Sequence, residues 1–555
     1  MERQAFFTAQ GKPFYSIGIQ SHNSSSYMPE QLRETFHAAQ LLEVNTVAVP
    51  VPWERYEPEE GCFDDAFISR ILSLAREYQL HLVLLWFGTW KNGTMEYTPE
   101  WVKQDTTRFP RVELKGGRKV LNLSPHCPAN LEADRKAFVR MMQTLKKLDS
   151  EEQTVIAVQI QNEAGYLSGT RRDFSVWGEA AFGAEVPELL LDWCESHPEC
   201  ALAQHRKQPR GSWTAVFGGD GAEYLTAYAI AEYIEQMALA AKQIYPIFLY
   251  TNAWITIGRG IAGLDWPSGT CAPQNLDIYY AVCEHLDTLA PDIYIPELTG
   301  YLQMLQDYNR PDLSRALYIP ESARTIYNSG VMFEAVGAGA IGFHVFGGES
   351  LLTDAQDALT EEGLSMYHSF HILRSVQPLL EQNLGVWDVH PIYRRGSEAN
   401  MLICGLRGGW RAFISFTGTV DGFLRMDYRH KEACQAETAG TANEPSRGLL
   451  IQTDENTFYI AGQGFRVFLL PELAADGSLD ALDASPALYP TNAEYASVRE
   501  GHFSEDGTFL VSRCRTGDES RHGVFALWDS GAIEIRMSAC LLYTSPSPRD
   551  AHESR

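Results

Sequence analysis

Short apolar runs alternate with helical patterns between residues 14 and 382, and this alternation limits the possible folds more than any other feature. Such alternation is typical of βα units and a parallel sheet. We therefore predict an α/β fold, a (β/α)8 TIM barrel. A doubly wound sheet is the alternative, but the first run lacks the Gly-rich phosphate turn expected there. The eight predicted strands are FYSIGIQ (14–20), NTVAVPV (45–51), LHLVLLWFG (80–88), TVIAVQIQ (154–161), IFLYTNAW (247–254), PDIYIPEL (291–298), ALYIPESAR (316–324) and AIGFHVFG (340–347).

The pattern changes near residue 385, where strand-like runs separated by glycine-rich or polar turns replace the βα alternation. Such a pattern of short strands and turns indicates a smaller all-β domain. We predict a catalytic barrel over residues 1–382 and an all-β accessory domain over 383–538. Residues 539–555, ACLLYTSPSPRDAHESR, break the pattern, and we expect a non-native or disordered tail there.

Charge and cysteine content exclude several classes of partner. The 555 residues carry a formal net charge of −26, which would repel nucleic acids and anionic membrane surfaces. A small neutral ligand is the simplest partner. The ten cysteines form no C-x-x-C pair and no ligand-like group with histidine, so we expect free thiols, a cytoplasmic location, no metal and no cofactor. Whether the chain forms a homo-oligomer stays open.

The fourth predicted strand ends in Asn162 and Glu163. Its residues are apolar throughout, as in a parallel strand covered on both faces, so the polar pair lies where the strand leaves the core. Ligands bind at the carboxyl ends of such strands. In the alternative interpretation, Asn162 caps a helix and Glu163 pairs with Arg171 or Arg172.

A second carboxylate, Glu321, follows the seventh predicted strand. Carboxylates at the ends of the fourth and seventh strands of a closed barrel both face its mouth. Two such groups can cleave a glycosidic bond, one by protonating the leaving oxygen and the other by attacking the anomeric carbon or activating water. Two unrelated ion-pairing glutamates are the alternative.

The motifs around these residues resemble those of known glycosidases. IQNEAG and IPESAR are similar to the fourth and seventh strand ends of retaining glycoside hydrolases with (β/α)8 barrels, and PVPWERYEPEEGCFD (50–64) resembles the second-strand motif of family 35 and 42 β-galactosidases. LSPHCPANLEAD and LAPDIY resemble a family 35-type branch that carries a β-domain of unassigned function.

This resemblance implies roles for individual residues. Glu163 would be the acid/base, Glu321 the nucleophile, and Asn162 would bind the sugar 2-hydroxyl. Tyr294 would donate a hydrogen bond to the nucleophile. The other residues expected to line the mouth and bind substrate are Trp53, Glu57, Asn252, Trp254 and His344.

Three of these lining residues have structural alternatives. Trp53 is equally compatible with a core position, Glu57 and Pro58 with shaping a loop, and His344 with a hydrogen-bonded core histidine. GFHVFG also departs from the tryptophan that many members of the clan have at the eighth strand.

The leading hypothesis is a retaining exo-β-galactosidase that acts on small oligosaccharides. A second hypothesis keeps the mechanism but changes the sugar to a glucoside, mannoside or glucuronide. The third is a carbohydrate-binding protein without activity, against which the intact carboxylate pair argues.

Overall fold

A computed structural model describes most of the chain. The chain divides into two compact units. The first comprises Met1–Arg324 and Ala338–Gly363, and the second comprises Thr325–Gly337 and Leu364–Arg555. The sequence places the domain boundary at residue 382 instead, and that boundary stays a prediction. The described residues are 3–255, 260–353, 358–382, 388–395, 401–416, 444–471, 494–504, 506–515, 517–521 and 523–538.

The first unit is built on an eight-stranded parallel sheet that closes into a barrel. The strand order is β11-β10-β9-β8-β5-β4-β3-β12, and a parallel bridge between Ile319 and Phe343 joins the two ends. This confirms the predicted fold class. The strands are β3 (Ser16–Gln20), β4 (Thr46–Pro52), β5 (His81–Lys91), β8 (Val155–Asn162), β9 (Phe248–Trp254), β10 (Thr288–Ile293), β11 (Glu321–Ser322) and β12 (Gly342–Phe346).

The bounds of the strands differ from their predicted ranges, most of all in β10 and β11. β10 begins at Thr288, three residues before the predicted run, and ends at Ile293, so Tyr294 follows the strand. β11 contains only Glu321 and Ser322, although Ile319 also bridges to β12. Pro320 lies between these two points, and a proline has no N–H to donate to a strand ladder, which explains the interruption.

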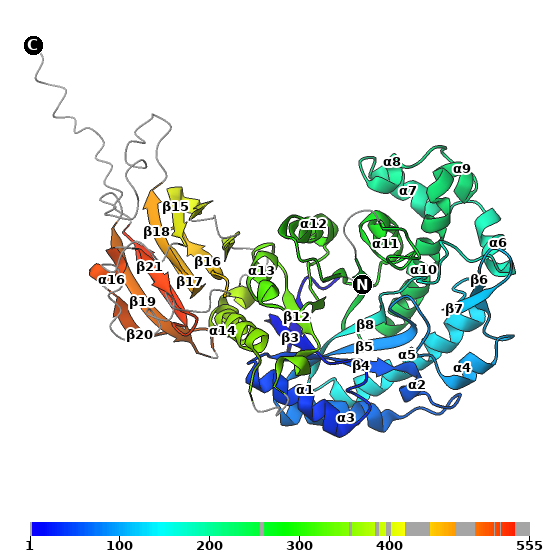
Figure 1. Ribbon diagram of the computed structural model, residues 1–555, viewed down its shortest axis with the longest axis horizontal. Helices are drawn as coiled ribbons and strands as arrows, with labels where there is room; N and C mark the ends of the chain where they lie inside the picture. Colours follow the sequence, from blue (N-terminus) through cyan, green and yellow to red (C-terminus); the bar gives the residue numbers. More distant parts are fainter. Residues whose placement is uncertain are drawn as a thin grey trace, which may run out of the picture. The chain divides into compact units, whose positions relative to one another are not determined.

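Helices surround the strands of this unit (Figure 1). In α3, the Asp64 side chain accepts a hydrogen bond from Phe67 N at the helix start, and apolar side chains that include Ile68, Ile71 and Leu72 are buried. The main helices between the barrel strands are α1 (Pro29–Leu41), α3 (Asp65–Glu77), α5 (Pro128–Asp149), α10 (Gly221–Ile244), α11 (Leu276–Val282) and α12 (Leu298–Tyr308).

Additional short elements lie in the loops of the first unit. The insertion between β8 and α10 folds into four short helices and a 3-10 turn, η1 (Gly218–Asp220). The remaining elements are β1 (Phe7–Ala9), β2 (Lys12–Phe14), α2 (Trp53–Tyr56), α4 (Glu100–Gln104), β6 (Arg111–Glu113), β7 (Lys119–Leu123), α6 (Val176–Gly183), α7 (Glu188–Ser196), α8 (Ala201–Gln204), α9 (Trp213–Phe217), η2 (Pro273–Asn275), η3 (Pro311–Leu313) and η4 (Gly348–Leu351).

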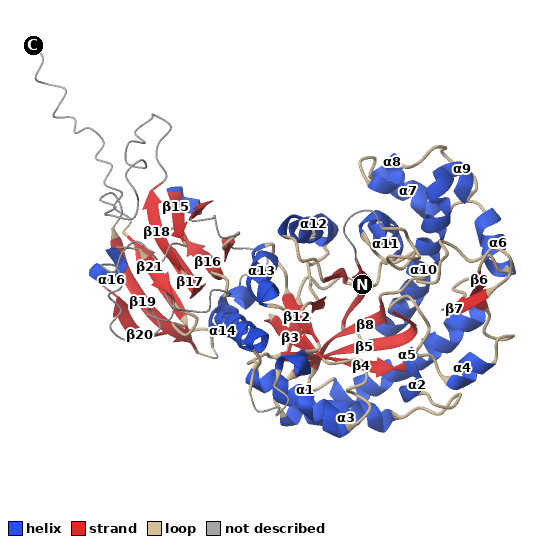
Figure 2. Cartoon of the chain, viewed as in Figure 1, coloured by secondary structure: helices blue, strands red, loops and turns tan. Residues whose placement is uncertain are grey.

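The second unit contains two antiparallel sheets that share one hydrophobic core. The sheet orders are β13-β16-β17-β22-β19-β20 and β14-β15-β18-β21, and Figure 2 shows how strands dominate this part of the chain. Trp410, Leu450 and Val467 are among the core residues, which come from both sheets. The elements are α13 (Ile326–Gly337), α14 (Glu361–Gln382), β13 (Asp388–Tyr393), β14 (Met401–Gly405), η5 (Arg407–Gly409), β15 (Trp410–Ser415), β16 (Arg447–Asp454), β17 (Thr457–Gln463), β18 (Phe465–Pro471), β19 (Tyr495–Phe503), β20 (Phe509–Arg515), α16 (Asp518–Arg521), β21 (Val524–Ala526) and β22 (Ala532–Met537).

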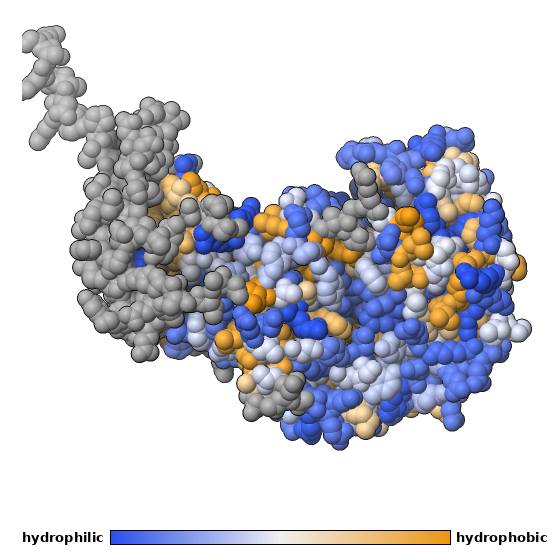
Figure 3. Space-filling view, in the orientation of Figure 1, coloured by the Kyte–Doolittle hydropathy of each residue, from blue (hydrophilic) through white to orange (hydrophobic). Residues whose placement is uncertain are grey.

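The visible surface of the first unit is mainly hydrophilic and is interrupted by separate hydrophobic groups (Figure 3). Within the described part of the chain, every helix is too short or too polar to span a bilayer.

Candidate active site

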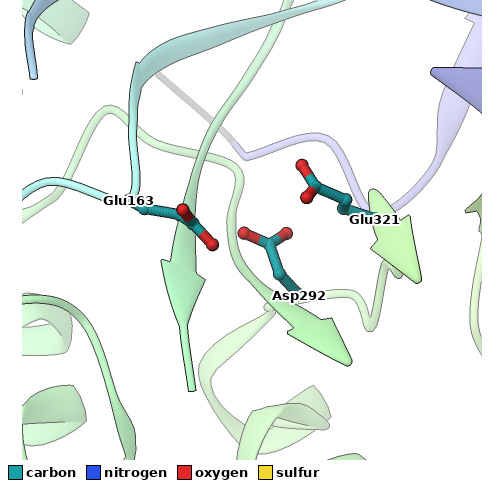
Figure 4. A group of neighbouring side chains, drawn as sticks. All are labelled: Glu163, Asp292 and Glu321. Atoms are coloured by element: carbon teal, nitrogen blue, oxygen red, sulfur yellow. The ribbon is translucent and has the colours of Figure 1, made fainter. Parts of the chain in front are cut away.

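Three buried carboxylates meet at the carboxyl ends of three barrel strands. Glu163 follows β8, Asp292 lies near the end of β10, and Glu321 begins β11. One carboxyl oxygen from each residue lies within 4.8 Å of the others, and Figure 4 shows the three groups facing a common space. Their side chains are nearly closed to solvent, at 5%, 1% and 6% exposure respectively. The structure therefore brings together the two glutamates singled out in the sequence and adds Asp292.

The backbone at the end of β8 adopts a conformation that directs Glu163 into the cluster. Gln161 has a φ of 62° and Glu163 a φ of 46°, both in the left-handed region that L-residues rarely adopt. Such a conformation costs roughly 1–2 kcal/mol per residue. The Glu163 N–H donates to Asn252 Oδ1 at 2.9 Å, and its carbonyl accepts from Gly93 N at 3.0 Å, so both backbone groups are held. Strain of this kind, held by its surroundings, is typical of functional sites.

Asn252 connects the ends of three strands. Its side-chain nitrogen donates to Asn162 Oδ1 at 3.2 Å and to Asp292 Oδ2 at 2.7 Å. Gln159 Nε2 also donates to Asn162 Oδ1, at 3.0 Å. The oxygen of Asn162 is thus occupied, while its nitrogen has only a 3.4 Å contact with Asn92 Oδ1. Asn162 can therefore offer a strong N–H donor to a ligand.

Tyr294 and Glu321 form a directed pair. The Tyr294 hydroxyl donates to Glu321 Oε1, as the resemblance implied. Glu321 Oε2 is buried and has no hydrogen-bond partner among the described residues. Tyr294 is itself 45% exposed, so it lies where the cluster opens to solvent. A carboxylate bonded on one oxygen and open on the other can attack an electrophile.

The charges around the cluster set the protonation of Glu163. Burial and the nearby Glu321 charge raise the pKa of Glu163 to about 7, while Lys91 acts in the opposite direction. Burial, Glu321 and Glu163 also raise the pKa of Asp292 well above its ordinary value. The three carboxyl groups therefore do not all ionise at neutral pH, and at least one retains a proton.

Glu163 does not make the surface ion pair considered as its alternative. Arg172 pairs with Glu179 at 2.9 Å, and Arg171 approaches Asp220 and Glu223 at 3.8 and 4.0 Å. The cluster thus carries more negative charge than a structural ion pair would.

Trp53 and Glu57 are buried and bind one another. Trp53 Nε1 donates to Glu57 Oε2 at 2.8 Å, and Glu57 Oε1 accepts from Gly61 N at 2.8 Å. These contacts stabilise the loop after β4, which agrees with the loop-shaping and core alternatives for this pair. Contact of either residue with substrate stays a prediction.

His344 lies within the barrel. Its Nε2 is 2.8 Å from Ser16 Oγ and its Nδ1 is 3.1 Å from Tyr318 Oη, so both ring nitrogens already have partners. Burial lowers the pKa of His344 to about 3, and the ring is therefore neutral. The core alternative describes this placement, whereas a substrate contact stays a prediction.

Trp254 ends β9, is partly exposed and pairs in register with Asp292.

Asp292 is the functional candidate that sequence reasoning missed. The signal was present in the segment LAPDIY (289–294). Asp292 there follows three apolar residues near a strand end, as Glu163 follows TVIAVQIQN. Asn252, predicted only as a lining residue, also turns out to connect Glu163, Asn162 and Asp292.

Among the described residues, Glu163, Asp292 and Glu321 form the group whose carboxyl oxygens lie close enough together to ligate a cation. Hard cations require six or more oxygen ligands. The surroundings present donors instead: Asn252 Nδ2 and the Tyr294 hydroxyl bind carboxyl oxygens, and the Lys91 charge acts on Glu163. These donors suit carboxyl groups that share protons better than a metal.

Two segments of the chain match known protein-family models. Residues 22–196, which include β8 and Glu163, match the family 42 glycoside hydrolase model described as β-galactosidase. Residues 366–527 match a second model, a domain of unknown function designated DUF5597. The segment similar to family 42 enzymes is thus followed by one similar to a domain of unassigned role, as the sequence resemblance suggested.

Solved structures of similar fold include two β-galactosidases. That of Bacillus circulans sp. alkalophilus is 14% identical, with a TM-score of 0.48 over 67% of this chain and 57% of that chain. A family 42 enzyme from G. stearothermophilus is 12% identical, with a TM-score of 0.49 over 68% and 59%. The exo-β-1,4-mannosidase of Opitutaceae bacterium strain TAV5 is 13% identical, with a TM-score of 0.41 over 69% and 63%. The match thus spans about three fifths of each of these chains. A search among curated proteins finds no match.

Proposed function

We propose that this protein is a retaining exo-β-galactosidase that removes terminal β-galactosyl residues from small oligosaccharides. The observation that carries the proposal is the approach of the Glu163 and Glu321 carboxyl oxygens to within 4.8 Å. Retaining enzymes hold their two carboxyl groups about 5–5.5 Å apart, whereas inverting enzymes hold them roughly 6.5–9.5 Å apart to admit a water molecule.

In the first step, Glu163 acts as the acid and Glu321 as the nucleophile. With a pKa of about 7, Glu163 keeps its proton in a large fraction of molecules at neutral pH and can donate it to the leaving oxygen. Glu321, with Tyr294 bound to Oε1, attacks the anomeric carbon through its free oxygen. The sugar is thereby transferred to Glu321 as an ester.

In the second step, Glu163 acts as the base. Formation of the ester removes the negative charge of Glu321, which is one of the two causes of the raised Glu163 pKa. The pKa of Glu163 therefore falls once the intermediate forms, and the ionised carboxylate can accept a proton from the attacking water. One pair of residues thus performs both steps.

Asn162 is positioned to bind the sugar. Its oxygen is occupied by Asn252 and Gln159, so its nitrogen is oriented as a donor beside Glu163. We propose that this donor binds the 2-hydroxyl, where a bond that strengthens in the transition state supplies several kcal/mol.

The family match supports galactose as the sugar. The same mechanism on a β-glucoside, β-mannoside or β-glucuronide is the second candidate. A purely binding role requires neither a proton donor with a pKa near neutrality nor a tyrosine bonded to a carboxylate, so the geometry disfavours it.

A panel of nitrophenyl β-glycosides tests the proposal. We expect the β-galactoside to give the highest kcat/KM and the released sugar to retain its β-configuration when followed by NMR. A preference for another β-glycoside with retention would replace the sugar and keep the mechanism. An initial α-product would overturn the mechanism, and absence of hydrolysis across the panel would contradict the proposed activity.

A further inference from the structure

Asp292 is the third carboxyl group of the cluster and has no role in the two-carboxylate mechanism. Its side chain is 1% exposed, so it does not bind bulk water. Oδ2 accepts from Asn252 Nδ2 at 2.7 Å, whereas Oδ1 is buried without a partner among the described residues. In Figure 4 the Asp292 carboxyl group faces that of Glu163.

We propose that Asp292 is a positioning residue that stays protonated through the catalytic cycle and donates a hydrogen bond to Glu163 whenever Glu163 is ionised. The proposal rests on the function proposed above, because it concerns the acid/base residue of that mechanism. The Asp292 proton is not transferred, so the two chemical steps keep the same balance of atoms and charge.

The hydrogen-bond geometry supports a carboxylic acid at this position. An ionised Asp292 would need donors on both oxygens, but Asn252 supplies only one. A protonated group places its O–H on the unpartnered Oδ1 and uses Oδ2 as the acceptor for Asn252. An oxygen of Glu163 and an oxygen of Glu321 lie within 4.8 Å of an Asp292 oxygen, and Oε1 of Glu321 already accepts from Tyr294.

The electrostatic surroundings agree with this assignment. Burial and the charges of Glu321 and Glu163 raise the Asp292 pKa, and only Lys91 opposes them among the neighbouring charges. The other titratable groups that face Asp292 are Tyr294, Tyr250, Tyr308, Tyr318 and Cys271, and burial raises the pKa of each of them above its ordinary value. These groups are neutral at pH 7, so Lys91 is the positive charge that the described residues supply near Asp292.

A hydrogen bond from Asp292 would tune Glu163 for its two roles. Burial and Glu321 raise the Glu163 pKa, whereas a donor to the ionised form lowers it, as Lys91 also does. Without that donor, Glu163 would remain a proton donor but ionise at higher pH. The second step, in which Glu163 must be ionised, would therefore slow most near neutrality.

Two substitutions at Asp292 test the donor role. Asp292→Asn keeps a neutral side chain with a donor for Glu163 and an acceptor for Asn252, whereas Asp292→Ala removes both. With a substrate whose leaving group departs easily, so that the second step limits kcat, we expect Asp292→Ala to lose about 10- to 100-fold in kcat at pH 7. The basic limb of its kcat/KM profile should move to higher pH.

Asp292→Asn should lose less than about tenfold and keep the basic limb near its position in the unmodified protein. A limb that moves to lower pH in Asp292→Asn would show that an ionised Asp292 had been removed, and would overturn the proposal. An unmoved limb in Asp292→Ala would reduce Asp292 to a packing role and would overturn it as well. Glu284→Gln is the matched control, because it removes an exposed carboxylate from the same unit.

Infrared difference spectroscopy tests the proton itself and needs no substrate. At pH 8.5, above the Glu163 pKa of about 7, the unmodified protein minus Asp292→Asn should show the carbonyl band of a carboxylic acid. Subtraction of Glu284→Gln should show none. Carboxylate bands in place of the acid band for Asp292 would overturn the inference even if hydrolysis is confirmed. Failure of the glycoside panel, by contrast, would leave this spectrum unchanged.

Discussion

The barrel contains two kinds of buried carboxylate, and their hydrogen bonds distinguish them. Asp134 is fully buried and accepts hydrogen bonds from Trp86 Nε1, Thr89 N, Gln161 Nε2 and Tyr233 Oη at 2.7–3.0 Å. Both of its oxygens are therefore satisfied by neutral donors. Glu223 is similar, since Ser268, the Gly269 N–H and Asn275 bind it.

The carboxylates at the barrel mouth are also buried but incompletely bonded. Asp292 and Glu321 each retain one oxygen without a partner among the described residues, and both lie near Glu163. Burial raises the pKa of Asp134 and Glu223 as well, so the direction of the shift does not separate the two kinds. What separates them is the combination of neighbouring like charges and unused acceptor oxygens. Structural carboxylates stabilise the fold, whereas those at the mouth are available for chemistry.

The largest expected effect comes from removing either of the two carboxylates to which we assign the chemistry, Glu163 and Glu321. Glu321→Ala and Glu163→Ala should each lower turnover by at least about 10²–10⁴-fold, the range for a positioned proton-transfer group. Azide should restore turnover in both, because it can replace the nucleophile or attack the intermediate in place of activated water. The Glu321 variant should yield an α-glycosyl azide and the Glu163 variant a β-glycosyl azide, as identified by NMR. The same anomer from both variants would show that the roles are misassigned.

Asp134→Ala should show the opposite profile, with a large loss of stability. The substitution removes the acceptor of the buried Trp86 Nε1 and Thr89 N donors, each at a cost of about 1–3 kcal/mol, and also removes one acceptor each from Gln161 and Tyr233. We expect the free energy of unfolding in urea to fall by at least about 3 kcal/mol. Glu321→Ala removes a charge that lies close to two other carboxyl groups. It should change the free energy of unfolding by less than about 1 kcal/mol. Equal losses in the two variants would remove the distinction between structural and catalytic carboxylates.

Tyr294→Phe should have an intermediate effect that is confined to catalysis. Loss of the hydroxyl removes a hydrogen bond to the ionised Glu321, a contact worth about 1.5–3 kcal/mol. The ionised nucleophile then lacks that stabilisation, so kcat/KM should fall by about 10- to 100-fold. The basic limb of its pH profile, near pH 7 from the Glu163 pKa, should move little. An unchanged kcat/KM would mean that Tyr294 only packs at the mouth.

Removal of divalent metal should have the smallest effect. The carboxyl cluster is surrounded by donors and functions in the proposed mechanism without a cation. Turnover after dialysis against a chelator should therefore match that of the untreated protein. Loss of turnover that one particular ion restores would instead assign the three carboxylates to a metal site.

The sequence predicted the barrel and the pair of glutamates at its mouth because both depend on local patterns. A buried parallel strand followed by a polar residue is visible in IQNE and IPES, and closure of the barrel brings such strand ends together. Tyr294 was predicted through the family resemblance, by its place near the end of the sixth predicted strand.

The remaining residues depend on tertiary packing that spacing does not reveal. The hydrogen bond between Trp53 and Glu57 joins residues four apart in the chain. The amino-acid sequence alone does not indicate that these two side chains turn toward each other. His344 is bonded to Ser16, 328 positions away in the chain. Asp292 gains its place only through tertiary contacts, with Asn252 forty positions away and with the carboxyl groups of Glu163 and Glu321.

The left-handed backbone at Glu163 has a consequence for protein engineering. Glycine adopts a φ of 46° freely, so Glu163→Gly would relieve roughly 1–2 kcal/mol of strain, partly offset by about 0.5–1 kcal/mol of added freedom in the unfolded chain. This substitution would abolish proton donation and leave a scaffold at least as robust as the parent. Crystallographers who wish to trap an uncut oligosaccharide would therefore do better with glycine at this position than with the customary alanine.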